Sequence, residues 1–238
     1  MPGHCTGRPV LRRLELKTCP PQVPNEAGAR PAPAAKLRRV TKLTWPAPER
    51  NKQPILSVLQ RVLPAQGRLL ELASGTGQHA SYFAEQMPGW TFQPSDLDAA
   101  NLASIGAWVQ GSGLSNLLEP VRIDVCSDDW GVSPANAIYN ANLIHIAPWE
   151  AAVGLLRGAA RHLLPDGVVI LYGPYRIAGQ HTAPSNESFD EDLKRRDPRF
   201  GVRDLEAIAD LAAQHGLELR ERVAMPANNQ TLLLRRRP

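Results

Sequence analysis

The residues of this sequence with the clearest chemical potential lie in one short loop, at positions 71–77. The loop begins with Glu71 and contains Gly75 and Gly77, and residues with helical spacing follow it from Ala80. Glycine lets a backbone approach a ligand closely, and the free amides at the start of a helix attract negative charge. The loop therefore predicts a nucleotide-like ligand. Two alternatives stay open, because a tight turn without a ligand has this composition and because Ala80 completes the dinucleotide pattern.

Three carboxylates, Glu71, Asp96 and Asp124, stand at the ends of successive predicted strands. In a doubly wound sheet the carboxyl ends of the strands converge on one crevice, so all three could face a single ligand. Asp96 is a suitable acceptor for two ribose hydroxyls, and Asp124 could accept from an adenine amino group. Either acid could instead cap a helix or face solvent in a turn.

The charge of Glu71 separates two kinds of ligand. A dinucleotide places its diphosphate over the helix N-terminus, and an acid four residues before Gly75 disfavours that arrangement. A cationic sulfonium with an amino-acid tail has the opposite charge and tolerates the acid. We therefore expect S-adenosylmethionine as the cofactor and keep an NAD(P)-dependent oxidoreductase as the alternative.

Short apolar strands that alternate with helical segments must position these residues, and this alternation predicts parallel strands joined by right-handed crossovers. The last two strands, joined at 225–229, must be antiparallel. Residues 176–200 are polar and are expected to form a long loop. The predicted fold class is α/β, a doubly wound, Rossmann-like, seven-stranded and mostly parallel sheet with a C-terminal antiparallel hairpin. Strands are expected at 68–73, 90–95, 120–125, 135–142, 167–175, 217–223 and 231–234, and helices at 55–62, 80–87, 99–109, 150–164 and 202–215.

The N-terminal part differs from the rest of the chain in composition. Residues 1–50 hold ten Lys or Arg against three acids, and nine of the 22 prolines in the 238 residues. Proline removes backbone donors, so residues 1–45 are expected to be a disordered basic tail and residues 46–238 a single α/β domain. The tail is either an arm that contacts nucleic acid or another polyanion, or a solvated extension.

Composition also limits where the protein works. No apolar run approaches the roughly 20 residues of a membrane span, and the N-terminus lacks a secretory signal, so a cytoplasmic protein is expected. Cys5, Cys19 and Cys126 are odd in number and lack paired ligand spacing. Neither a disulfide framework nor a metal site is expected from them.

Taken together, residues 50–238 resemble the class I S-adenosylmethionine-dependent methyltransferases. Their first motif is an acid followed by a Gly-x-Gly loop, which Glu71, Gly75 and Gly77 match, and their ribose acid matches Asp96. Their adenine-side acid and final antiparallel hairpin match Asp124 and residues 217–234. The cofactor contacts expected here are Glu71, Ala73, Gly75, Gly77, Asp96, Leu97, Asp124, Val125 and Asn140.

One departure from the class I pattern concerns the fourth strand. Asn136 and Asn140 stand there, where many members carry an acid. The resemblance then implies that amides hold the amino-acid end of the cofactor. Arg50 and Asn51 are expected to close the cofactor site from the first helix.

More closely, the sequence resembles the methyltransferase-like twenty-six family and its bacterial relatives. This narrower resemblance implies the same fold and cofactor and supplies no acceptor. It rests on six strings: Glu49-Arg-Asn51-Lys, Asn142-Leu-Ile-His145-Ile-Ala-Pro-Trp149, Tyr172-Gly-Pro-Tyr175, Ser185-Asn-Glu-Ser-Phe-Asp190, Gly201-Val-Arg203-Asp and Met225-Pro-Ala-Asn-Asn229.

Methyl transfer from a sulfonium is an in-line displacement, so positioning supplies much of the acceleration and a base is optional. His145, just beyond the fourth strand, is the candidate base because its unperturbed pKa lies near neutrality. It could instead bond a neighbouring loop. Tyr175 is the second catalytic candidate.

Polar residues on later segments are expected to surround the acceptor. Asn side chains in turns often bond their own backbone, and Asp190 could simply pair with Arg203, so ordinary structural roles stay open for all of them. His181 is expected to be solvated and Trp149 to pack. The candidates are Asn142, Asn186, Asp190, Arg203 and Asn228.

The long polar segment and the lack of an appended recognition domain favour a small-molecule acceptor. The fourth strand ends in Asn140-Ala-Asn142-Leu rather than the Asn-Pro-Pro-aromatic pattern of many amine methyltransferases, which disfavours nucleic acid as the substrate. A non-catalytic regulatory protein that binds S-adenosylmethionine has the same fold and stays an alternative.

Overall fold

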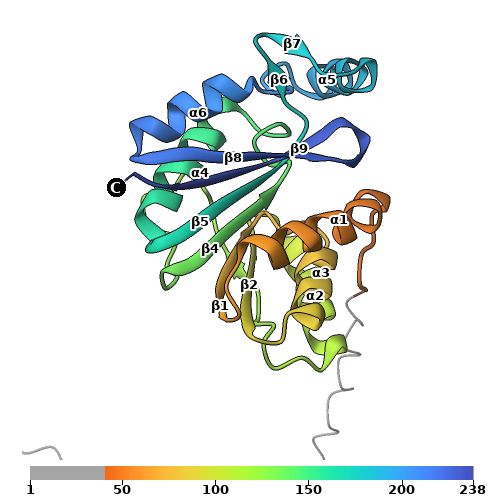
Figure 1. Cartoon of the computed structure of the whole chain (residues 1–238). Coiled ribbons are helices and arrows are strands. Elements are labelled where there is room, and N and C mark those ends of the chain that lie inside the picture. Colours follow the sequence, from red (N-terminus) through yellow and green to blue (C-terminus); the bar gives the residue numbers. More distant parts are fainter. Residues whose placement is uncertain (1–40, 238) are drawn as a thin grey trace, which may run out of the picture. The chain divides into compact units, whose positions relative to one another are not determined.

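A seven-stranded sheet forms the centre of the computed structural model, which describes residues 41–237 (Figure 1). Its strands are β1 (Gly67–Leu72), β2 (Trp90–Asp96), β3 (Val121–Arg122), β4 (Ala135–Ala141), β5 (Leu163–Gly173), β8 (Leu217–Met225) and β9 (Asn229–Arg236). They lie in the order β3-β2-β1-β4-β5-β9-β8. Pairing is parallel from β3 to β5, and β9 is antiparallel to β5 and β8. The predicted fold class is therefore confirmed.

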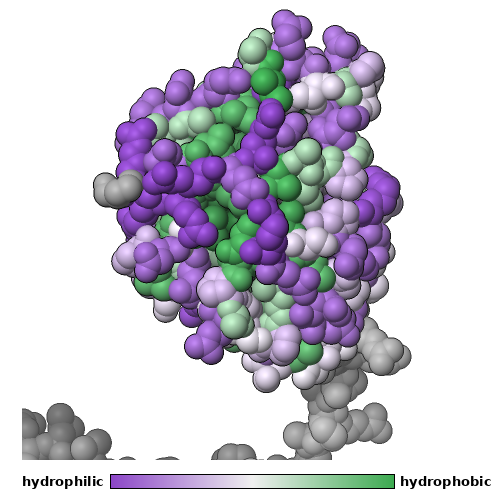
Figure 2. Space-filling view, in the orientation of Figure 1, coloured by the Kyte–Doolittle hydropathy of each residue, from purple (hydrophilic) through white to green (hydrophobic). Residues whose placement is uncertain are grey.

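The helices cover both faces of this sheet. They are α1 (Pro46–Val62), α2 (Gln78–Gln86), α3 (Ala99–Ser112), α4 (Trp149–His162), α5 (Pro184–Arg196) and α6 (Leu205–Gln214). Because successive residues of a strand point to opposite faces, Leu69 packs in the core beneath α1 and α2, whereas Leu70 and Leu72 pack beneath α4 and α6. Figure 2 shows the first of these faces, where apolar side chains gather over the middle of the sheet between hydrophilic neighbours.

Three expectations are wrong in detail. Helix α1 begins at Pro46, nine residues before the expected start at residue 55. The third strand is only two residues long, because β3 pairs with no more than Ser95 and Asp96 of β2. The expected loop at 176–200 holds a two-stranded hairpin, β6 (Arg176–Ile177) and β7 (Gln180–His181), and then helix α5. Helix α5 is hard to recognise because two of its three buried residues, Asn186 and Asp190, are polar.

The expected tail, residues 1–45, lies outside the described residues except for residues 41–45. Within residues 41–237, no helix has both the length and the apolar character that crossing a membrane demands.

Candidate functional site

The loop between β1 and α2 adopts a backbone that its sequence is suited to form. Gly75 and Gly77 have φ angles of 58° and 90°, in the left-handed region that glycine enters at little cost. Ala73 shares this region, with a φ of 52°, although it is not a glycine. At Gly77 a Cβ atom would also stand 3.0 Å from the backbone of Ile105. The loop therefore brings its backbone against α3 and leaves the adjoining amides near the carboxyl edge of the sheet.

Asp96, the last residue of β2, fastens this loop. Its Oδ2 accepts a hydrogen bond of 2.9 Å from the Gly75 amide, and its Oδ1 accepts bonds from the Asp98 amide and the Asn101 side chain. The residue is only 6% exposed. Strand β2 and the glycine loop are thus held together by one carboxylate that also lines a cavity.

That cavity, called the loop cavity below, measures about 340 Å³. Its floor comes from β1 and the loop that follows it, with Glu71, Ala73 and Gly75 among the lining residues. Trp45, Ile146 and Phe189 line it from other segments. An adenosine-sized ligand with a short tail matches these dimensions.

Glu71 forms the polar floor of the loop cavity. It is 3% exposed, and its Oε2 has no hydrogen-bond partner among residues 41–237. Burial raises its pKa to about 8, the nearby Asp96 charge adds to that rise, and a hydrogen bond with Ser74 opposes it. The carboxyl group is therefore mostly protonated at neutral pH until a cation approaches it.

His79 lies beside Glu71, with 3.9 Å between its Nδ1 and Glu71 Oε1. Burial lowers the pKa of His79 to about 4, so the imidazole is neutral when Glu71 is protonated. The two groups are thus a neutral pair rather than an ion pair. His79 Nε2 bonds to Asn51 Oδ1 at 2.7 Å, which links the floor of the cavity to α1.

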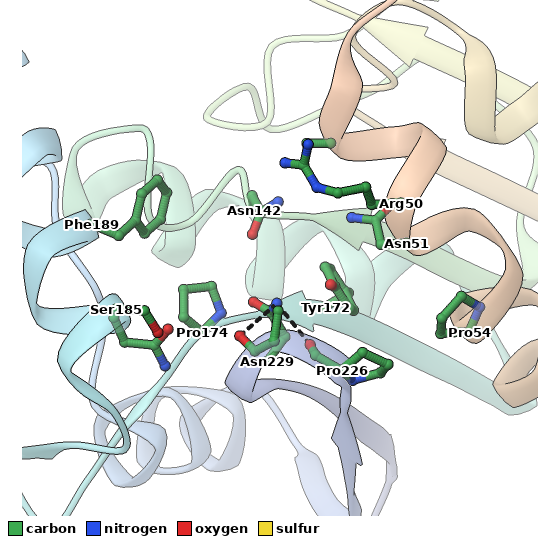
Figure 3. Close-up of a pocket in the computed structure, with 13 residues that line it drawn as sticks. Arg50, Asn51, Pro54, Asn142, Tyr172, Pro174, Ser185, Phe189, Pro226 and Asn229 are labelled. Atoms are coloured by element: carbon green, nitrogen blue, oxygen red, sulfur yellow. Dashed lines mark hydrogen bonds between the residues drawn. The ribbon is translucent and has the colours of Figure 1, made fainter.

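A second cavity of about 700 Å³, called the outer cavity below, adjoins the loop cavity. Figure 3 shows that it lies between α1, the end of β5, helix α5 and the turn that joins β8 to β9. Ala47, Asn51, Asn142 and Phe189 line both cavities. A ligand in the outer cavity would therefore meet a ligand in the loop cavity across this shared wall.

The expected cofactor residues divide into two groups. Glu71, Ala73, Gly75 and Asp96 line the loop cavity, whereas Gly77 caps the N-terminus of α2. The others do not line the cavity, and they lie as follows: Leu97 is 48% exposed next to Asp96, Val125 is buried, Asp124 is exposed and accepts from the Cys126 amide, and Asn140 donates to Leu72 O and accepts from the Leu143 amide.

The expected acceptor residues divide in the same way. Asn142 lines both cavities and Asn186 lines the outer one. Asp190 is 3% exposed and bonds instead to Lys194 and to the Val202 amide, each at 2.7 Å. Burial raises the pKa of Asp190, but these hydrogen bonds lower it more, so the carboxylate is ionised and holds α5 against the next segment.

Arg203 and Asn228 also lie outside both cavity walls. Arg203 donates to the Ile144, Ala147 and Arg199 carbonyls, which ties the segment before α6 to the segment after β4. Asn228 contacts Ser185 through its side chain and accepts from Asn186 through its carbonyl. Both residues therefore join neighbouring segments of the chain and do not line either cavity.

His145 follows β4 as expected but is completely buried. Its Nδ1 accepts from the Arg203 amide at 3.3 Å, and its Nε2 has no hydrogen-bond partner among the described residues. Burial lowers its pKa to about 3. A Cβ on Gly173 would come within 2.5 Å of Nε2, so this nitrogen faces the end of β5 and neither cavity. Its role as a base thus has no geometric support.

Tyr175 packs edge-on against His145, with ring centroids 5.0 Å apart. Its side chain is fully buried, and its hydroxyl has no hydrogen-bond partner among residues 41–237. Burial raises the pKa of Tyr175. Its place beneath the cavity wall matches a positioning role better than contact with an acceptor.

Two aromatic residues of the site, Trp45 and Phe189, were not expected from the sequence. Trp45 stands at the boundary assigned to the tail, and its ring lies over Gly75, where a Cβ would come within 3.0 Å of it. Phe189 sits in the segment expected to be a loop and lines both cavities. Helical spacing over 184–196 would have placed Phe189 on the same face as Asn186, three residues before it.

The family of the chain follows from a match over most of its length. The sequence pattern of the family described as "protein of unknown function (DUF938)" matches residues 42–236. The chain belongs to the DUF938 family. The match includes all residues that line the two cavities of this DUF938 protein.

Solved structures with this fold include O-methyltransferases. An O-methyltransferase family protein from Burkholderia thailandensis has a TM-score of 0.69 and 16% identity, over 80% of this chain and 57% of that one. An O-methyltransferase family 2 protein from Planctomyces limnophilus, solved with apigenin, has a TM-score of 0.64 and 18% identity, over 79% and 62%.

NcsB1, an O-methyltransferase from neocarzinostatin biosynthesis, was solved with S-adenosylmethionine and 2-hydroxy-5-methyl naphthoic acid. Its TM-score is 0.62 at 17% identity, over 78% of this chain and 56% of that one. The DUF938 protein thus spans 56 to 62% of the length of these three proteins, and the likeness shows a shared fold. The narrower resemblance to the methyltransferase-like twenty-six family stays a prediction.

Proposed function

We propose that this DUF938 protein is an S-adenosylmethionine-dependent methyltransferase that acts on a small molecule. The observation that carries the proposal is the pair of adjoining cavities, which share Ala47, Asn51, Asn142 and Phe189. Transfer of a group between two ligands needs both reacting atoms within about 3 to 3.5 Å. Two cavities with a common wall at the carboxyl edge of the sheet suit that demand.

The electrostatics of the loop cavity support this donor over a dinucleotide. The floor carries Glu71 with one unpartnered oxygen, and Asp96 stands at the side. Asp96 opposes a diphosphate, which would also keep Glu71 protonated. A ligand with an ammonium group would instead favour the charged form of Glu71, and its ribose hydroxyls could donate to Asp96. When bound, S-adenosylmethionine supplies a methyl group that its sulfonium makes electrophilic.

Apolar side chains around the loop cavity support an adenine-bearing ligand. Four large apolar residues are exposed among residues 41–237, and three of them, Trp45, Leu97 and Ile146, line this cavity or adjoin Asp96. Apolar side chains that line a cavity favour an apolar or aromatic part of a ligand. We propose that the adenine ring covers some of these side chains.

Small-molecule acceptors are supported by the size of the outer cavity and by the neighbours. NcsB1 and the Planctomyces protein hold a naphthoic acid and apigenin, respectively. In the proposed enzyme, Asn142 and Asn186 contact the acceptor. His145, Tyr175, Asp190, Arg203 and Asn228 position the surrounding segments.

Calorimetry on the full chain tests the proposal. We expect S-adenosylmethionine and its demethylated product to bind and NADH not to bind. Binding of NADH alone would refute the proposed donor. Incubation with labelled S-adenosylmethionine and a small-molecule cell extract should then transfer the label to an extract component. Binding without transfer from any extract would instead favour the non-catalytic binding protein.

A further inference from the structure

The charges in the outer cavity differ from those in the loop cavity. Among the described residues that line it, Arg50 is the one charged side chain, and none is Asp, Glu or His. Its other polar groups are amides and hydroxyls, such as those of Asn142, Ser185 and Tyr172. The wall therefore offers a positive charge and hydrogen bonds, and offers no side chain that would accept a proton at neutral pH.

Arg50 has no hydrogen-bond or ion-pair partner within residues 41–237. The neighbouring acid, Glu49, pairs instead with Lys52 and accepts a hydrogen bond of 2.6 Å from Gln78. Figure 3 shows the Arg50 side chain extending from α1 into the cavity. Arg50 is the fifth residue of α1, one position beyond its first turn. An anion beside Arg50 would give its guanidinium the partner that residues 41–237 do not supply.

Tyr172 lines the outer cavity together with Arg50, at the end of β5. Burial raises the pKa of the Tyr172 hydroxyl, while a hydrogen bond with Asn51 and the positive charge of Arg50 oppose the rise. The hydroxyl keeps its proton at neutral pH and can donate to a ligand that Arg50 binds.

The remaining wall of the outer cavity is largely apolar. Pro54, Pro174, Pro226 and the Phe189 ring face it from four different segments. A ligand that suits this wall has an apolar or aromatic body with one anionic end. Because Ala47 and Asn51 flank Arg50 on α1 and line both cavities, the anionic end would lie near the shared wall.

We infer that the outer cavity takes small organic carboxylates with an apolar body, and that the carboxylate bound by Arg50 is itself the methyl acceptor. The inference rests on the proposed function and names its substrate class. A carboxylate meets two demands at once. It is the bidentate partner that an Arg guanidinium prefers, and it is a nucleophile that has already lost its proton.

Methyl transfer from the sulfonium to a carboxylate oxygen needs no base, because the acceptor carries no proton. One carboxylate oxygen forms the new bond to the methyl carbon, while the bond from that carbon to the sulfonium sulfur breaks and its electron pair goes to sulfur. An anion and a cation become a neutral methyl ester and a neutral thioether. Arg50 then faces an uncharged ester, which it binds less tightly than the acid, so product release is favoured.

Binding of two probes with the same ring system tests the recognition. We expect 2-naphthoate to bind the full chain, in the presence of S-adenosylhomocysteine, at least tenfold more tightly than 2-naphthamide. Arg50→Gln should remove this preference and leave the affinity for S-adenosylhomocysteine unchanged. Arg61→Gln is the matched control, because Arg61 is on the same helix and pairs with Glu221 away from the cavity. Equal binding of acid and amide would overturn the inference.

The alkali stability of the product tests the acceptor atom. Methyl esters hydrolyse in mild alkali and release methanol, whereas methyl ethers and methylamines do not. We expect label transferred from S-adenosylmethionine to a cell extract to become volatile after alkali, and Arg50→Gln to abolish that fraction. Alkali-stable label would overturn the inference while leaving the methyltransferase proposal intact. Failure of S-adenosylmethionine to bind would instead remove the proposed function. If Arg50→Gln no longer binds S-adenosylmethionine, Arg50 contacts the donor rather than the acceptor, and the inference is overturned.

Discussion

Replacing Glu71 with glutamine would remove the ionisable group from the floor of the loop cavity while keeping its shape. Glu71 has a pKa of about 8 in the folded chain because burial disfavours its charged form. In the unfolded chain its pKa returns to the ordinary value of 4.5. Between these values the folded protein keeps a proton that the unfolded chain has released.

The sign and size of the effect follow from this difference. The favourable contribution of protonated Glu71 to the free energy of unfolding is complete below pH 4.5 and is lost as the pH rises through 8. The loss is about 1.4 kcal/mol per pH unit, so raising the pH from 6.5 to 8 should lower the free energy of unfolding by about 2 kcal/mol. Burial lowers the pKa of His79 to about 4, which destabilises the fold only below pH 6.5, and this part is common to both proteins.

Binding of the donor should release the proton that Glu71 holds in the free protein. A cationic donor favours the charged form of Glu71, so binding of S-adenosylmethionine near pH 7 should release close to one proton from the wild type. Glutamine cannot release it. The affinity of the wild type should therefore rise between pH 7 and pH 8.5 more steeply than that of the variant.

Urea unfolding at pH 6.5, 7.25 and 8 measures the first effect, and calorimetry in buffers of different ionisation enthalpy measures the second. We expect the unfolding free energy of Glu71→Gln to stay nearly level over this range while that of the wild type falls. Parallel curves for the two proteins, or equal proton release on binding, would show that Glu71 is already ionised in the folded state.

Four further predictions follow from the contacts of the site. Asp96→Ala should weaken S-adenosylmethionine binding by about 1 to 3 kcal/mol because hydroxyls lose a charged partner, and unchanged affinity in calorimetry would exclude the ribose role. His145→Ala should lower the unfolding free energy by about 2 to 4 kcal/mol through a buried void, without changing donor affinity; a fully stable variant without turnover would restore the role of base. Gly173→Ala places a Cβ 2.5 Å from His145 Nε2 and should cost about 1 to 3 kcal/mol; the control Gly106→Ala on α3, where a Cβ would meet only Glu119 Oε2 at 3.9 Å, should stabilise by about 0.5 to 1 kcal/mol. Trp45 is 48% exposed above Gly75, so donor binding should reduce acrylamide quenching of the wild type and not of Trp45→Phe, and equal reduction in both would place the ligand elsewhere.

The part of the site that local sequence could predict is the part built from consecutive residues. Glu71, Gly75 and Asp96 were predictable because glycines directly after a strand often form a ligand-binding turn. In a parallel sheet the carboxyl ends of neighbouring strands then lie at the same edge. Asp124 was expected at the same edge, but its strand is too short to carry it there, so it bonds locally to the Cys126 amide.

The parts that could not be predicted depend on contacts between distant segments. Asn140 looked like a ligand residue from its position, yet Leu72 and Leu143 use both ends of its amide. Phe189 enters the site only because α5 folds against the turn between β8 and β9, where Asn186 bonds to the Asn228 carbonyl. Leu72 lies 68 residues from Asn140 in sequence, and Asn228 lies 42 residues from Asn186.

The wall shared by the two cavities has a thermodynamic consequence. Asn51, Asn142 and Phe189 face both ligands, so a donor that orders these side chains changes the surface that an acceptor meets. Whatever factor the donor contributes to acceptor affinity, the acceptor must contribute to donor affinity, because the cycle of binding steps closes. A measured change in acceptor affinity on donor binding should therefore equal the change in donor affinity on acceptor binding.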